Sequence, residues 1–156
     1  MNIEKNYIIN ENFMYMTGYH DRFGKLCSLV RENNRMFIVD QSPLEILSDS
    51  IRSIGFSLKG AIESAKWHLG NIPMCPFIVN PIYKICVFPT KSANNPETIW
   101  FNPDHIKRTK GNVNHTIITF SNGFDLKVPC RLSSFNTKLQ NAEQLIKLIL
   151  GKTPSH

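Results

Sequence analysis

Two neighbouring segments in the first half of the chain have the apolar spacing of helices. The first begins at Ser42, where Pro43 and Glu45 complete a proline start and a capping box, and it ends at Gly55. The second begins at Ser57 and ends at Gly70. Their apolar stripes are Leu44, Leu47, Ile51 and Ile54 in the first, and Leu58, Ile62, Ala65 and Leu69 in the second. The pattern predicts two helices joined by a glycine turn.

The longest helical pattern lies near the C-terminus. Ser133 or Ser134 is the predicted cap, and Gly151 with Pro154 ends the helix. The apolar stripe consists of Phe135, Leu139, Ala142, Leu145, Ile146 and Ile149, and the lysines off the stripe are Lys138, Lys147 and Lys152.

Short apolar and β-branched runs elsewhere predict strands. Residues 5–16 favour two extended pieces broken at 10–12, and 20–24 form a turn. The predicted strands further along are 25–32 and 35–40, joined by Asn33-Asn34; 76–80 and 84–90, joined around Asn80-Pro81; and 98–101, after a loop over 91–98. The first 40 residues therefore form a small β meander.

The clearest hairpin is predicted over 115–128. A two-residue turn at Asn122-Gly123 would place Phe120 opposite Asp125. A three-residue loop with Gly123 in the left-handed region instead pairs Phe120 with Phe124. It also pairs Ile118 with Leu126 and Thr116 with Val128, so this register keeps the apolar partners on one face.

The order of these elements is strands, helices, strands and a final helix. This order predicts an α+β fold, an antiparallel β-rich single domain over 1–156 with a central helical segment and a long C-terminal amphipathic helix. A chain of this length can bury a sizeable core as one domain.

Charge gives the first indication of function. There are 18 Lys and Arg against 12 Asp and Glu, a formal net charge of +6, which attracts polyanions such as nucleic acid, anionic lipid or acidic protein. The four cysteines form no C-x-x-C pair or zinc set, so we expect reduced thiols, no metal and no cofactor. The start of the chain has no apolar signal region, and no run is long enough to span a membrane.

Common catalytic motifs are absent from the sequence, and we expect no enzyme activity. His105 beside Asp104 could be a base oriented by a carboxylate, but a turn aspartate next to a strand histidine explains the pair more simply.

Two groups of cations are candidates for contact with phosphates. The first group is Arg52, Ser57, Lys59 and Lys66, around the serine-rich turn between the predicted helices. Arg52, Lys59 and Lys66 recur every seven residues, which places them on similar faces if the helices are continuous. The second group is Lys107, Arg108 and Lys110. The alternatives are a solvated helix face for the first group and a charged strand edge for the second. Helix, glycine turn and helix also resembles a helix-turn-helix motif.

Several stretches, in order and with compatible spacing over about 24–140, resemble the ComK family of bacterial competence transcription factors. The matching pieces are GKLCS (24–28), PLEI (43–46), Arg52, Gly55-x-Ser57-x-x-Gly60, PFIVNP (76–81), VFPT-x-S (87–92), Trp100, His105-Ile106 and TFSNG (119–123). The resemblance implies a cytoplasmic, nucleoid-associated activator of DNA-uptake genes that binds A·T-rich double-stranded DNA through the minor groove. It also implies a homo-oligomer and a proteolytic adaptor as partners, and no membrane.

The sequence departs from the family pattern after Gly60, where the family is more basic and glycine-rich than 60–64 is here. Lys59 and Lys66 are the cations that could substitute. The chain also stops soon after its last helix, whereas longer members carry a further tail linked to proteolytic control. The alternative function, by analogy of fold alone, is a pleckstrin-homology-like module that binds anionic lipid or protein.

Overall fold

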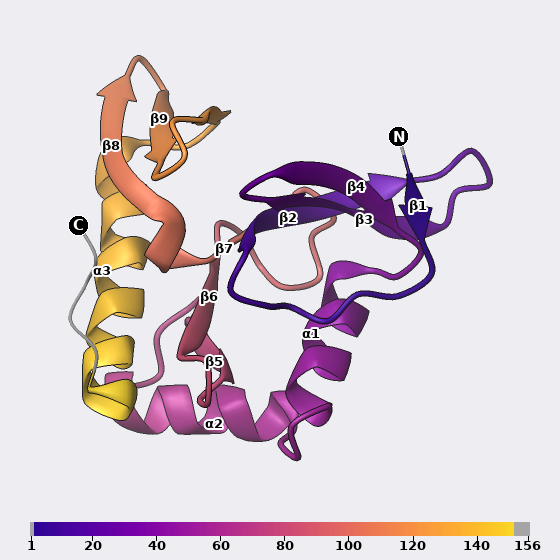
Figure 1. Ribbon diagram of the computed structural model, residues 1–156. Coiled ribbons are helices and arrows are strands. Elements are labelled where there is room, and N and C mark those ends of the chain that lie inside the picture. The colour runs from indigo at the N-terminus through magenta and orange to yellow at the C-terminus, as the bar shows by residue number, and fades with distance from the viewer. Residues whose placement is uncertain (1, 152–156) are drawn as a thin grey trace.

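Two sheets and three helices make up residues 2–151, the part of the chain that the computed structural model describes (Figure 1). The seven-stranded sheet has the order β1-β4-β3-β2-β7-β6-β5, and the three-stranded sheet has the order β10-β9-β8. The strands of the large sheet are β1 (Ile3–Glu4), β2 (Phe13–His20), β3 (Leu26–Glu32), β4 (Arg35–Val39), β5 (Phe77–Asn80), β6 (Ile85–Pro89) and β7 (Ile99–Phe101). Those of the small sheet are β8 (Ile106–Asn112), β9 (His115–Phe120) and β10 (Asp125–Val128). The helices are α1 (Pro43–Arg52), α2 (Leu58–Leu69) and α3 (Leu132–Leu150). The predicted α+β class is confirmed.

The predicted N-terminal meander is present as β2, β3 and β4, with antiparallel pairing throughout. The two extended pieces predicted over 5–16 are wrong in detail, because residues 5–10 have no regular secondary structure and β2 runs on to His20. The backbone of residues 5–10 forms hydrogen bonds with side chains rather than with a neighbouring strand. The Tyr7 N–H donates to Gln41 Oε1 at 3.1 Å, and the Ile9 N–H donates to Ser50 Oγ at 2.9 Å. β1, which no pattern indicated, pairs parallel with β4.

Helix α1 begins with the predicted capping box, in which Ser42 Oγ accepts from the Glu45 N–H and Glu45 accepts from the Ser42 N–H. Its predicted stripe needs a correction. Ile46 and Ser50 are buried, whereas Leu44 and Ile54 are only half-buried. The buried face is rotated because α1 packs against β2, β5 and the N-terminal segment together.

The hairpin of β9 and β10 has the predicted register. Ile118 pairs with Leu126 and Thr116 with Val128, and the Phe120 N–H donates to the Phe124 carbonyl at 2.9 Å. Gly123 has φ +89°, which a side chain would strain.

Helix α3 carries the predicted apolar stripe on its buried face, with Ile149 only half-buried. The predicted serine cap is wrong, because the N-cap is Arg131 and no side chain caps the helix. The helix starts earlier because Leu132 packs on Gly111 of β8, where an added Cβ would lie 3.0 Å from the Leu132 Cβ. Gly151 ends the helix as predicted and has the left-handed conformation, whereas Lys152 and Pro154 lie outside the described residues.

Phe101 of β7 joins the two sheets and α3. Its ring centroid lies 6.0 Å from Tyr15 of β2, 5.6 Å from Phe88 of β6, 6.2 Å from Phe120 of β9 and 5.3 Å from Phe135 of α3. All five rings are buried. A single aromatic cluster therefore packs the small sheet, the large sheet and α3 against one another.

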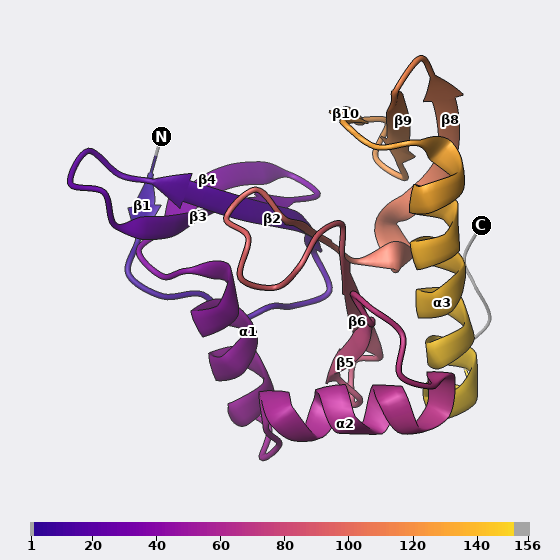
Figure 2. The same cartoon turned by 180° about the vertical axis from the view of Figure 1, so that it is seen from behind.

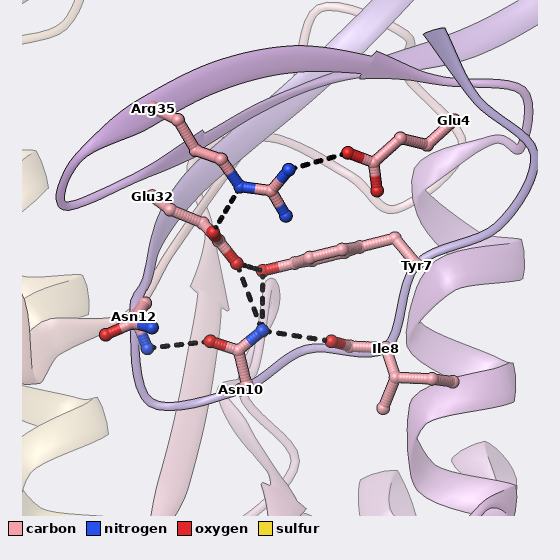
Figure 3. A network of polar contacts seen from close by, with 7 residues as sticks. All are labelled: Glu4, Tyr7, Ile8, Asn10, Asn12, Glu32 and Arg35. Atoms are coloured by element: carbon pink, nitrogen blue, oxygen red, sulfur yellow. Dashed lines mark hydrogen bonds and ion pairs between the residues drawn. The ribbon is translucent and has the colours of Figure 1, made fainter. Parts of the chain in front are cut away.

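A buried carboxylate anchors the N-terminal segment to the meander (Figure 3). Glu32 accepts hydrogen bonds from Tyr7 Oη at 2.6 Å, Arg35 Nε at 2.8 Å and Asn10 Nδ2 at 3.0 Å. Burial alone would raise the pKa of Glu32, but these three donors outweigh it and hold the pKa below its usual value. Burial, followed by the bond to Glu32, raises the pKa of Tyr7, so the phenol stays protonated and donates.

Glu32→Gln removes the charge that three donors address, and we expect it to lower the free energy of unfolding by about 2–3 kcal/mol at neutral pH. Since the pKa of Glu32 is lowered by folding, its stabilisation is present above the unfolded value of about 4.3 and is lost as the pH falls through the folded value. Urea unfolding of wild type and variant should therefore converge at low pH. Glu4→Gln, at the exposed end of the network, is the control, with an expected loss below about 1 kcal/mol.

Candidate nucleic-acid interface

The outer face of the small sheet carries the second group of candidate cations. Strand pairing aligns Arg108 with Thr119 and Asp125, and Lys110 with Ile117 and Lys127. Alternation directs these residues away from α3, whereas Ile118 and Thr116 point inward and are buried. The outer face is hollow, with a volume of about 600 Å³ lined by Arg108, Lys110, Gly111, Asn112, Ile117, Thr119 and Asp125.

Lys107 lies at a β-bulge in the same strand. The register of β8 against β9 shifts between Ile106 and Arg108, so Lys107 is the extra residue and is exposed. Within residues 2–151, Lys107, Arg108 and Lys110 form no ion pair. The expected charged strand edge is present, since β8 is the outer strand of its sheet.

Arg52 does not share a face with Lys59 and Lys66. Residues 53–57 interrupt the helix, and α1 and α2 run in different directions (Figure 1). The condition of continuous helices is therefore not met. Arg52 is 68% exposed and lies 3.4 Å from Asp49, an exposed pair that contributes little.

Lys59 and Lys66 do lie on one flank of α2, about 10 Å apart at seven residues of helix. Both are exposed, and neither forms an ion pair within the described residues. Ser57 is the N-cap of α2, and its Oγ accepts from the Gly60 N–H at 3.1 Å. The hydroxyl is thus engaged in capping.

The cations of β8 and the C-terminal end of α2, which carries Lys66, lie at opposite ends of α3, whereas Lys59 and Arg52 lie near the other end of α2. The first turn of α3 packs on β8, where Thr109 Oγ1 donates to Asn136 Oδ1 at 2.9 Å, and its last turns lie beside α2 (Figures 1 and 2). A helix of 19 residues is about 28 Å long. The fold therefore presents two separate cationic surfaces.

The remaining candidate groups have structural partners. His105 Nε2 lies 2.6 Å from the Glu11 carbonyl oxygen, which ties the 3₁₀ turn Pro103–His105 to the start of β2. Burial raises the pKa of the Cys86 thiol. Among the described residues, no group of three or more metal-binding side chains is found, and no helix is long and apolar enough to cross a membrane.

A family model described as ComK protein matches residues 4–153. The chain belongs to the ComK family. It is also similar to the competence transcription factor of Bacillus subtilis (strain 168), with 32% identity over 118 residues. The match covers 74% of this chain and 61% of that protein, so the chain spans less than two thirds of its relative. No solved structure matches.

Residues 60–64 depart from the basic pattern expected of the ComK family. Part of this segment lines an apolar groove. Gly60, Ala61 and Ser64 of α2 form one wall, and the groove has a volume of about 700 Å³. The other lining residues are Ile51, Gly55, Phe56, Ser57, Ile78, Val79, Pro81 and Ile149.

Sequence reasoning missed Lys127 and His115, which strand pairing places on the outer face with Lys110 and Arg108. The predicted register of β9 against β10 already directed Lys127 outward. The missing information was that β8 pairs with β9 on its other side.

Ser57→Ala removes the cap of α2, and we expect the free energy of unfolding to fall by about 1 kcal/mol. Ser57→Asn, which can cap equally well, should restore stability to within a few tenths of a kcal/mol. Ser64→Ala, exposed on the same helix, is the control and should be nearly neutral. Equal stability of Ser57→Ala and wild type in urea unfolding would contradict the capping role.

Proposed function

We propose that this protein is a non-enzymatic, sequence-selective DNA-binding transcription factor that activates competence genes. Membership of the ComK family and the similarity to a competence transcription factor support this class of function. The observation that carries the proposal is the pair of exposed cationic surfaces, whose lysines have no acidic partner in residues 2–151.

The preferred ligand is A·T-rich double-stranded DNA, contacted through the minor groove. The minor groove distinguishes A·T from G·C pairs, and its narrow A-tract form concentrates negative potential that attracts Arg and Lys. Phosphate contacts supply most of the affinity, and groove width supplies the selectivity. This mode suits a protein whose cations lie on a sheet face and a helix flank.

Arg108, Lys110 and Lys107 contact one segment of the duplex, and Lys59, Lys66 and Arg52 contact another. Along α3, about 28 Å separates the β8 cations from the end of α2 that carries Lys66, which is close to the roughly 34 Å of one turn of B-DNA. Ser57, the N-cap of α2, begins the helix that carries Lys59 and Lys66.

The protein acts in the cytoplasm at the nucleoid, as a homo-oligomer, and a proteolytic adaptor controls its amount. These parts of the proposal come from the family resemblance.

The first test compares binding to a duplex containing two A·T-rich boxes with binding to a G·C-rich duplex of equal length, across a salt series. We expect A·T preference that survives moderate salt, with about 0.9 in log–log slope for each phosphate neutralised. Equal and steeply salt-sensitive binding to both duplexes would contradict sequence selectivity and leave only generic charge attraction.

The second test removes each cationic surface. Changing Lys107, Arg108 and Lys110 to Gln should weaken binding and lower the salt slope by about 2–3, and so should the same change of Arg52, Lys59 and Lys66. The reversal Arg52→Glu with Lys59→Glu should abolish binding and leave the circular dichroism spectrum unchanged. A matched control changes the exposed residues Lys5, Arg22 and Lys84 to Gln, which removes the same charge elsewhere. Equal losses in the control and the surface variants would contradict the assigned sites.

A further inference from the structure

Trp67 is the most exposed large apolar side chain of the described residues, at 82%, and it lies on the outer face of α2. Its ring contact is with the adjacent His68, at 4.9 Å between centroids. Figures 1 and 2 show α2 along one edge of the molecule, and no other described element covers its outer side. A tryptophan in this position exposes a large apolar surface that packing within the chain does not use.

An apolar hollow borders the same helix face. Gly60, Ser64 and Trp67 are spaced by four and three residues, so they lie along one face of α2. Gly60 and Ser64 are exposed and form a wall of the apolar groove, and Phe56, 57% exposed, lies beside them at the start of the helix. The projection and the hollow thus lie at opposite ends of one short helix.

We propose that this face is the contact surface between two copies of the chain, which pack their α2 helices antiparallel around a two-fold axis. An isologous contact places each Trp67 over Gly60 of the other copy, between Phe56 and Ser64. The small side chains at 60 and 64 let the helices approach closely. The inference names the interface of the homo-oligomer included in the proposed function, and in that respect rests on it.

The two-fold arrangement has a geometric effect on the lysines of α2. Lys59 and Lys66 lie on one flank of the helix, about a quarter turn from Trp67. A two-fold axis perpendicular to both helices and parallel to their contact carries that flank of each copy to the same side of the pair. The four lysines therefore lie on one side of the pair, two on each helix, where a single duplex can contact them.

Charge favours a second copy as the occupant. Glu63 lies between the two lysines of its own helix and, in the antiparallel pair, within one turn of Lys66 of the other copy. Covering Trp67 and Phe56 in both copies removes roughly 550 Å² of aromatic surface from water. This is about half of the ~1,000 Å² that a specific interface needs. The exposed Ile82 and Tyr83, next to Pro81 at the edge of the groove, extend the apolar surface.

Sedimentation equilibrium of the full chain tests the interface. Wild type should dimerise in a concentration-dependent way, and Trp67→Ala should weaken the dimer on the order of 30-fold, as expected for an interface hot spot. Ser64→Arg, which fills the hollow from an exposed position, should weaken it similarly. Phe23→Ala is the matched control, because Phe23 is 81% exposed on the turn between β2 and β3 and lies outside the proposed contact.

Fluorescence gives a second readout, since the chain has two tryptophans and Trp100 is fully buried. Acrylamide quenching of wild type therefore reports on Trp67, and it should decrease as the dimer forms. A wild type that stays monomeric up to about 100 μM, a dimer unaffected by Trp67→Ala and Ser64→Arg, or a Trp67 equally quenched at all concentrations would each overturn the interface.

The outcome is separable from that of the DNA-binding proposal. A dimer that requires Trp67 but shows no A·T preference would support the interface and contradict the proposed function. If the protein binds A·T-rich DNA selectively but Trp67→Ala does not change its dimerisation, the interface alone is contradicted.

Discussion

The fold depends on the packing of Phe101. This side chain belongs to β7 of the large sheet. Its ring contacts rings from β2, β6, β9 and α3, at centroid distances of 5.3–6.2 Å. The small sheet is attached to the large one through this cluster, through His105, whose Nε2 lies 2.6 Å from the Glu11 carbonyl oxygen, and through Asn122, whose Nδ2 donates to the Asn33 carbonyl. A cavity at Phe101 would therefore loosen both sheets and the helix that supports them.

Local signals in the sequence predicted the local elements well. The capping box at Ser42, the register around Gly123 and the apolar stripe of α3 each follow from short-range rules, and each is present. The errors arose where distant residues decide. The backbone of residues 5–10 bonds to Gln41 and Ser50, and the start of α3 is fixed by its packing on β8. Such long-range contacts do not produce a periodic pattern of apolar residues in the sequence.

The candidate site was predictable only as separate pieces. The clustering of Lys107, Arg108 and Lys110 could be seen in the sequence, but the hollow and the contribution of Lys127 depend on the pairing of three strands. The seven-residue spacing of Arg52, Lys59 and Lys66 indicated one face, yet the break at 53–57 separates Arg52 from the others. The resemblance to the ComK family came from motifs scattered along the chain, and membership of the family supports the proposed class of function, which charge alone leaves open.

The pairing of β2 with β7 has a consequence for how the chain is made. Met16 pairs with Trp100, so the centre of the large sheet joins segments from opposite ends of the first two thirds of the chain. On the ribosome, β2, β3 and β4 emerge first, and the free edge of β2 then waits on the order of ten seconds for its partner strand. An open edge is a template for pairing with other chains. During synthesis, the edge of β2 is therefore open to other chains until β7 emerges.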